Sequence, residues 1–261
     1  MSRLAGLTRA RPWRVVERNA IVGRRRWYVH LVGGAEPFLF LFSVGVGVGA
    51  LIDSVTGPTG EPVAYREFVA PAMLAGAAMN TAVFTSTIDF FVRYRYLQTY
   101  DAMLATPLAP PDLVRGELGW TSLRVAFYAT AFVLTMLAMG LVHSPWAVLA
   151  VPATLLVGLA FGCLGMAAST WLRSWLDFDL VMLATVPLFL FSATFFPLDR
   201  YPDWLQPLVR LSPLYHGTDL LRRLVLGGVG WEQAVSVGYL GALTLVGLRV
   251  AERRVVRQLQ P

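Results

Sequence analysis

Residues 147–170 read AVLAVPATLLVGLAFGCLGMAAST and contain no charged side chain. An α-helix rises about 1.5 Å per residue, so a run of this length can cross the roughly 30 Å hydrocarbon core of a bilayer. Five further apolar stretches of comparable length occur at residues 31–52, 68–92, 118–142, 178–196 and 233–250. The sequence therefore predicts an all-α integral membrane protein with six transmembrane helices.

The composition supports a single membrane domain. Of the 261 residues, 56% are hydrophobic and 15% are charged, which is more apolar surface than a soluble domain of this size buries. We expect a transmembrane domain at residues 31–250. A cytoplasmic amphipathic segment at residues 1–30 precedes it, and a cytoplasmic basic tail at residues 251–261 follows it.

The distribution of arginine predicts the orientation. All 22 Lys and Arg residues are arginine, and 16 of them fall before span one, between spans two and three, between spans four and five, or from Arg249 at the end of span six onward. Arginine in short loops is retained on the cytoplasmic side. Both termini are therefore expected in the cytoplasm.

Several kinds of chemistry are excluded by what the sequence lacks. Without lysine there is no Walker A motif and no Schiff-base residue. The single cysteine, Cys163, has no partner for a disulfide, and His30, His143 and His216 are too scattered for a metal site. We expect no catalytic residues, no metal and no cofactor bound by this chain.

Two segments outside the spans are too apolar to be simple linkers. In residues 1–30, hydrophobic residues alternate with eight arginines, as in a helix that lies on anionic lipid headgroups. Residues 197–232 are rich in leucine but interrupted by prolines. We interpret them as two short helices that dip into the outer leaflet, with their arginines reaching back to the headgroups.

The connection between spans two and three contains a short predicted helix. Thr99 can cap it, Asp101 favours its N-terminal end, and Pro107 ends it after about two turns. Such a helix would expose Tyr100, Met103 and Leu104. The residues alone leave two interpretations open, which are docking onto a partner protein and lying flat on the membrane.

A resemblance favours the first interpretation. The stretches TYDAMLATPL at residues 99–108 and DLVRGELGW at residues 112–120 resemble the coupling-helix region of type-2 ABC exporter permeases, in particular the nodulation-factor (lipo-chitooligosaccharide) exporter permease subgroup. Further similar stretches are EP at 36–37, FVAPAMLA at 68–75, FFP at 195–197 and LSPLYHGTDLLR at 211–222. The resemblance covers nearly the whole chain.

The resemblance implies a multi-pass exporter subunit in the bacterial inner membrane. Its expected partners are a separate nucleotide-binding subunit that binds ATP and Mg, a second permease copy or a paralogue, and membrane lipids, with no nucleic acid. The implied ATPase-docking residues of the coupling helix are Thr99, Tyr100, Asp101, Met103, Leu104 and Pro107. The implied residues of an extracellular re-entrant gate are Phe195, Pro197, Trp204, Pro213 and Tyr215.

Polar residues within the spans are the remaining candidates, because charge at bilayer depth is costly and often functional. Glu36, Asn80, Asp89 and Arg124 could line a transport path or only bond neighbouring helices. Asp89 and Arg124 both fall near the cytoplasmic side, so we predict that they form an ion pair. The apolar character of spans one, two and five and the resemblance together imply an amphiphilic, lipid-linked or drug-like cargo. The alternative is a proton-coupled secondary transporter that uses Asp89 or Glu36. An intramembrane enzyme is not supported, because the sequence has no paired carboxylates, histidine cluster or nucleophile with a base at a workable spacing.

Overall fold

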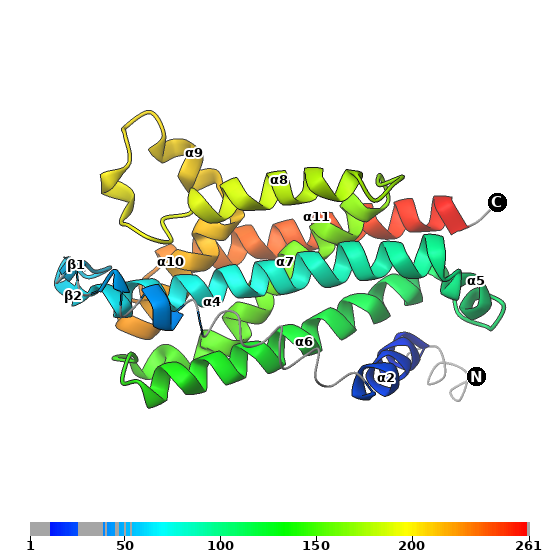
Figure 1. Cartoon of the computed structure of the whole chain (residues 1–261), viewed down its shortest axis with the longest axis horizontal. Helices are drawn as coiled ribbons and strands as arrows, with labels where there is room; N and C mark the ends of the chain where they lie inside the picture. Colours follow the sequence, from blue (N-terminus) through cyan, green and yellow to red (C-terminus); the bar gives the residue numbers. More distant parts are fainter. Residues whose placement is uncertain are drawn as a thin grey trace.

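The computed structural model describes residues 11–25, 39, 41–44, 47–49, 51–52 and 54–259. In this part of the chain, long helices lie side by side along the longest axis of the molecule (Figure 1). The α-helices are α2 (Arg11–Arg24), α4 (Tyr65–Val83), α5 (Thr99–Leu104), α6 (Pro110–Ala138), α7 (Ala150–Ser169), α8 (Asp177–Leu190), α9 (Gln206–Leu211), α10 (Pro213–Leu226) and α11 (Glu232–Leu259). The predicted first span lies mostly outside the described residues.

Smaller elements complete the architecture. The strands β1 (Ser54–Thr56) and β2 (Pro62–Ala64) pair antiparallel with Val55 opposite Val63, and short 3-10 helices occupy Pro145–Leu149 and Leu198–Arg200. The helix of α4 continues through two π-helical segments, Phe84–Asp89 and Val92–Tyr96. The β-hairpin formed by β1 and β2 was not predicted from the sequence. The prediction of a helical fold is confirmed.

Among the described residues, four helices are long and apolar enough to cross a membrane: Tyr65–Tyr96, Pro110–Ala138, Pro145–Ser169 and Glu232–Leu259. They correspond to the predicted spans two, three, four and six. The predicted fifth span at residues 178–196 is wrong at its C-terminal end, because α8 stops at Leu190. At about 1.5 Å per residue, this helix is only about 21 Å long.

Side-chain hydroxyls explain why α8 can end there. The last carbonyl groups of a helix have no partner within the helix and must be satisfied in another way. Ser192 Oγ donates to the Leu188 carbonyl, Thr194 Oγ1 donates to the Phe189 carbonyl, and Tyr201 Oη donates to the Leu190 carbonyl. The apolar composition of residues 191–196 looked like helix, whereas these hydroxyls support irregular backbone.

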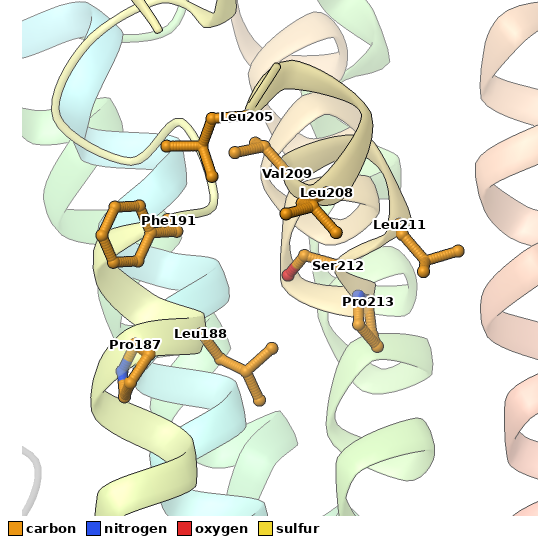
Figure 2. A pocket seen from close by; sticks show the side chains of 9 residues that line it. All are labelled: Pro187, Leu188, Phe191, Leu205, Leu208, Val209, Leu211, Ser212 and Pro213. Carbon is orange, nitrogen blue, oxygen red and sulfur yellow. The ribbon is translucent and has the colours of Figure 1, made fainter. Parts of the chain in front are cut away.

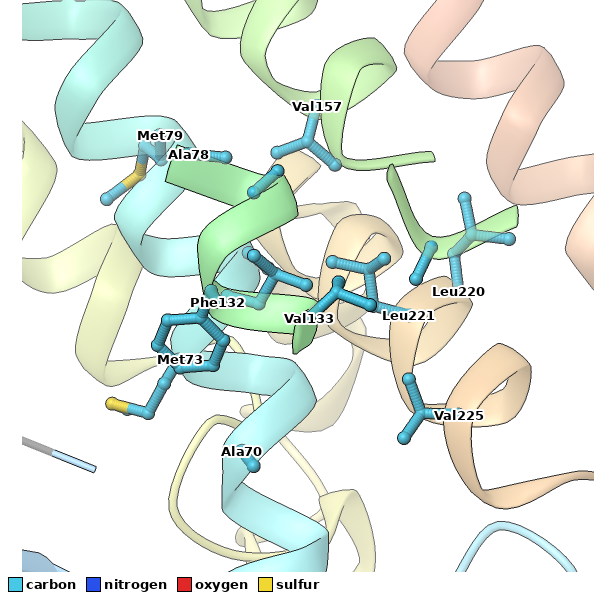
Figure 3. Close-up of a cluster of buried hydrophobic side chains, with 14 of the residues drawn as sticks. Ala70, Met73, Ala78, Met79, Phe132, Val133, Val157, Leu220, Leu221 and Val225 are labelled. Atoms are coloured by element: carbon cyan, nitrogen blue, oxygen red, sulfur yellow. The ribbon is translucent and has the colours of Figure 1, made fainter. Parts of the chain in front are cut away.

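The main apolar core lies between α4, α6, α7 and α10. Figure 3 shows Met73 and Met79 from α4 near Phe132 from α6, with Val157 and Leu221 on the other side. Close approach depends on glycine, since a Cβ at Gly158 of α7 would lie 2.8 Å from Val125 Cγ1 of α6. This contact agrees with the expectation that small residues bring membrane helices together.

A second apolar cluster lies at the end of the bundle that carries α2, α5 and the C-terminal part of α11, which we call the inner end (Figure 1). Its fully buried members are Val15, Tyr100, Leu113, Val114, Met166, Ala251 and Val255, among others. The predicted basic tail at residues 251–261 is continuous with α11, because this helix extends to Leu259. The opposite end, with the β-hairpin, α9 and the start of α10, is called the outer end.

Candidate docking and coupling site

The predicted short helix between spans two and three is present as α5, and it projects at the inner end beyond the long helices (Figure 1). The prediction that Thr99 caps it is wrong. Thr99 is already the first helical residue, and the preceding residue, Gln98, has a left-handed backbone with φ 45° and makes no side-chain cap. The left-handed backbone of Gln98 interrupts the helix and so separates α5 from the π-helical end of α4.

The two faces of α5 differ in exposure. Tyr100 is 0% exposed, so the prediction that it is presented to solvent is wrong. Its ring packs against Phe90, with centroids 5.0 Å apart. Met103 and Leu104 are half-buried, whereas Asp101 and Ala102 of α5 and Ala105, Thr106 and Pro107 of the turn after it form an exposed outward face. The aromatic side chain therefore fixes α5 to the long helices and leaves a small, polar face outside.

Beneath Tyr100 lies a buried ion pair that joins two spans. Arg93 Nη1 lies 2.9 Å from Glu117 Oε1 and 2.7 Å from Glu117 Oε2. The two side chains are 18% and 4% exposed. Arg93 belongs to the π-helical end of α4 and Glu117 to the first part of α6.

The N-terminal helix α2 takes part in the same junction. Asn19 Oδ1 accepts a hydrogen bond of 3.1 Å from Arg93 Nη1. Val15 and Val16 of α2 lie over Gly116 and Gly119 of α6, where a Cβ at Gly116 would be 2.5 Å from Val15 Cβ. We name Asn19, Arg93, Tyr100 and Glu117 the inner junction.

The Tyr100 hydroxyl is the polar end of a buried ring. Burial raises the pKa of Tyr100 well above its usual value, and the nearby Glu117 carboxylate acts in the same direction. The hydroxyl lies beside the Glu117 carboxylate and the Arg93 guanidinium but makes no hydrogen bond of ordinary geometry with the described residues. Tyr100 is therefore neutral, and its ring rather than its hydroxyl supplies most of the contact.

The predicted pair between Asp89 and Arg124 is confirmed. Arg124 Nη1 donates to Asp89 Oδ2 at 3.0 Å, and the side chains are 21% and 37% exposed respectively. Asn80 is exposed on α4, and Glu36 lies outside the described residues. The structure thus brings together two of the four predicted polar residues.

The predicted gate residues lie around the end of α8 and the starts of α9 and α10. Phe195 packs edge-on against Phe189, with ring centroids 5.6 Å apart. Trp204 is 72% exposed, and Pro213 occupies the first turn of α10. Pro197 and Tyr215 are half-buried. The two predicted short helices between spans five and six are therefore present as α9 and α10.

An apolar groove of about 370 Å³ lies among these residues. Figure 2 shows side chains from the end of α8 facing side chains from α9 and the start of α10 across it. The groove is lined by Pro187, Leu188, Phe191, Leu205, Leu208, Val209, Leu211, Ser212 and Pro213. Its lining is almost entirely apolar.

The prediction that the arginines of residues 197–232 reach back to the headgroups is wrong for Arg222, which is buried and holds this region to α4. Arg222 of α10 is 5% exposed, and its guanidinium lies 3.6 Å from the centre of the Phe68 ring. Its Nε donates to the Phe68 carbonyl at 3.1 Å, and its Nη2 donates to the Ala193 carbonyl at 2.8 Å. We name Arg222, Phe68 and Ala193 the outer junction.

Sequence reasoning also missed Glu117 and Asn19 as functional candidates, because one lies in an apparently ordinary helix start and the other in an arginine-rich segment. The charge of Glu117 directly before the predicted span at residues 118–142 was the available signal. Across the described residues, no group of three or more histidine, cysteine or acidic side chains could hold a metal ion.

The long apolar helices define a multi-pass integral membrane protein. The chain belongs to the ABC-2 type transporter family, which matches residues 13–226. It is a membrane subunit of an ABC transporter, and the family implies an ATP-binding partner subunit. The resemblance to the nodulation-factor exporter permeases is confirmed by the relatives below.

The relatives are proteins called Nodulation protein J. The one from Rhizobium leguminosarum bv. viciae is 30% identical over 258 residues, which cover 97% of this chain and 96% of the relative. The one from Rhizobium leguminosarum bv. trifolii is 34% identical, covering 82% of this chain and 80% of the relative. The one from Sinorhizobium fredii is 32% identical and covers 91% of each chain.

Proposed function

We propose that this chain is the permease subunit of an ATP-driven exporter, in which a separate nucleotide-binding subunit docks on α5. The observation that carries the proposal is the division of α5 into a buried aromatic face and an exposed face of small and polar residues. A helix of this kind can follow the motion of a partner while it remains fixed to its own domain. Because the chain contains no lysine, ATP and Mg would be bound by the partner.

The revised geometry changes which residues would contact the ATPase. Asp101, Ala102 and Pro107 lie on the outward face together with Ala105 and Thr106. Met103 and Leu104 would contribute their exposed edges, and Thr99 would contribute to the start of the surface. Tyr100 would act from inside, as the residue that connects this surface to the spans.

The proposed orientation places the inner end in the cytoplasm. The helix α2, the end of α11 and α5 all lie at that end, where most of the cytoplasmic arginines were predicted (Figure 1). Six spans would then include residues 31–52 and the short helix α8. Two permeases, either two copies or a copy and a paralogue, would enclose the path, with Asn80 as a candidate lining residue.

The proposed cargo is an amphiphilic, lipid-linked or drug-like molecule. The apolar groove beside α8 and the exposed apolar faces of the spans support this class. The gate at the outer end would consist of Phe195, Pro197, Trp204, Pro213 and Tyr215. The resemblance to lipo-chitooligosaccharide exporter permeases also supports an amphiphilic cargo.

The test is co-purification with a P-loop ATPase encoded beside this chain, followed by measurement of ATP hydrolysis by the complex. We expect Asp101→Arg and Ala102→Arg to abolish association while the permease remains folded. Trp204→Arg, at the outer end, is the matched control and should leave association unchanged. An ATPase that binds Asp101→Arg and Ala102→Arg as well as the original chain would refute docking on α5.

The proton-coupled alternative named Asp89 or Glu36 as its carboxylate. The Asp89 carboxylate is engaged in an ion pair with the Arg124 guanidinium at 3.0 Å, and Glu36 lies outside the described residues. Uptake of protons coupled to transport, in vesicles without ATP, would support this alternative over the proposed exporter.

A further inference from the structure

We infer that the Arg93–Glu117 pair is the positioning element that fixes α5 relative to the spans, and that α2 is linked to it through Asn19. This inference gives the proposed docking helix an internal support, so it rests on the proposed function. The contacts themselves lie within one chain and can be tested without the ATPase.

The place of the pair in the sequence gives it control over α5. Arg93 precedes α5 and Glu117 follows it, so the pair closes the base of the loop that carries α5. The Tyr100 ring lies within this base, where the charges of both Arg93 and Glu117 act on its hydroxyl. A displacement of α5 must therefore move Tyr100 against the pair or open the pair.

The burial of the pair argues for a role in position rather than in stability. Removing two charges from water is costly, and an apolar pair of similar volume is often at least as stable. Here both carboxylate oxygens face a single guanidinium nitrogen, which fixes the relative position of two helices. The pair is also adjacent to π-helical turns, which often mark functional sites.

The link to α2 has two parts, a close helix contact at Gly116 and a hydrogen bond from Arg93 to Asn19. A Cβ at Gly116 would lie 2.7 Å from the Pro12 carbonyl oxygen, so glycine is needed for α2 to lie this close to the turn of α6 that carries Glu117. Asn19 is 2% exposed and reaches Arg93 from the same helix. A movement of α2 would therefore reach the Arg93–Glu117 pair and, through it, α5.

The same stretch of α6 supplies a matched control. Arg115, two residues before Glu117, forms an ion pair of 2.7 Å with Glu252 of α11. Its side chain is 55% exposed, so its interaction is weakened by solvent. Arg115→Gln removes an ion pair from the same helix turn without touching the inner junction.

The first experiment measures the mobility of α5 by electron paramagnetic resonance. A nitroxide is attached to Ala102→Cys in the Cys163→Ala protein, purified without any ATPase. Glu117→Gln should raise the mobility of the label, and Asn19→Ala should raise it to a smaller extent. Arg115→Gln should leave it unchanged.

The second experiment separates positioning from folding. In the complex with the ATPase, Glu117→Gln should lower the rate of ATP hydrolysis about tenfold, which is a typical size for a coupling between two sites. The dissociation constant of the ATPase should stay the same. Exchanging the charges, with Arg93→Glu and Glu117→Arg together, should restore much of the rate. A purely structural role would lower binding and hydrolysis together.

Equal label mobility in Glu117→Gln and Arg115→Gln would overturn the inference about the pair, and unchanged mobility in Asn19→Ala would overturn the link to α2. Failure of the original chain to bind an ATPase would instead overturn the proposed function, because the mobility measurement does not depend on that subunit.

Discussion

The inner and outer junctions each contain a buried arginine, but the two arginines are held differently. Arg93 faces the carboxylate of Glu117, whereas Arg222 is held by backbone carbonyls and by the face of the Phe68 ring. In the described part of α10, the ion pairs involve Arg223 and not Arg222. The difference matters because a broken ion pair leaves a second buried charge, whereas a broken carbonyl contact leaves only a neutral group.

The segments that the two junctions hold also differ. The inner junction connects helical segments, among them the π-helical end of α4, while the outer junction holds the non-helical residues 192–194, where Ala193 has φ 53°. Non-glycine residues adopt this conformation at some cost, and the surrounding contacts must maintain it. We therefore expect the inner junction to transmit movement and the outer junction to open first.

The largest expected effect comes from breaking the inner pair. Glu117→Ala leaves the Arg93 guanidinium buried and unpaired, which should lower the free energy of unfolding by about 3–5 kcal/mol. The measurement is thermal unfolding of the purified permease in detergent. Arg115→Ala, which breaks an exposed pair on the same helix, should cost at most about 1 kcal/mol, and an equal loss in both variants would contradict the comparison.

A smaller effect is expected at the outer junction. Arg222→Met removes the contacts to the carbonyls and to the Phe68 ring but leaves no unpaired charge, so it should cost about 2 kcal/mol. Thermal unfolding gives the cost, and limited proteolysis near residues 191–205 should become faster. Arg210→Gln, on an exposed position of α9, is the control, and a larger loss in Arg222→Met than in Glu117→Ala would reverse the ranking.

The partly exposed pair between the two junctions should contribute less than either. Asp89→Asn and Arg124→Gln should each cost about 1 kcal/mol or less, since both side chains are only partly buried within the protein. A double-mutant cycle on the unfolding temperature should show that the two effects are not additive. Additive effects would mean that the contact contributes nothing.

The smallest effect is expected for the hydroxyl of Tyr100. Because the hydroxyl lies beside Glu117 and Arg93 without a hydrogen bond of ordinary geometry, Tyr100→Phe should change the free energy of unfolding by no more than about 0.5 kcal/mol. Tyr100→Ala removes the ring and should cost about 3–5 kcal/mol. If Tyr100→Phe were as harmful as Tyr100→Ala, the hydroxyl rather than the ring would connect α5 to the spans.

The sequence was sufficient to predict the elements that depend on length and apolar character. The four long spans, the helix in residues 1–30, the helix α5 and the pair of helices after α8 were all predicted, because each has a local pattern of charge, proline or hydrophobicity. The pair between Asp89 and Arg124 could be predicted because both charges interrupt neighbouring spans at the same depth.

Features that depend on tertiary contacts were predicted wrongly or missed. Tyr100 looked like an exposed aromatic side chain because its cover comes from Phe90 and other residues distant in the sequence. The end of α8 at Leu190 depends on hydroxyls up to 11 residues away in the sequence, at Tyr201. Glu117 and Asn19 became candidates only when three helices brought them to Arg93.

The central claim is that the outward face of α5 contacts a separate ATPase. A photoreactive benzoylphenylalanine placed at Ala102 in the assembled transporter tests it most directly, with the same residue at Trp204 of the outer end as the control. The account predicts a cross-link from position 102 to a P-loop ATPase and none from position 204. No cross-link from position 102, or equal cross-linking from both positions, would contradict it.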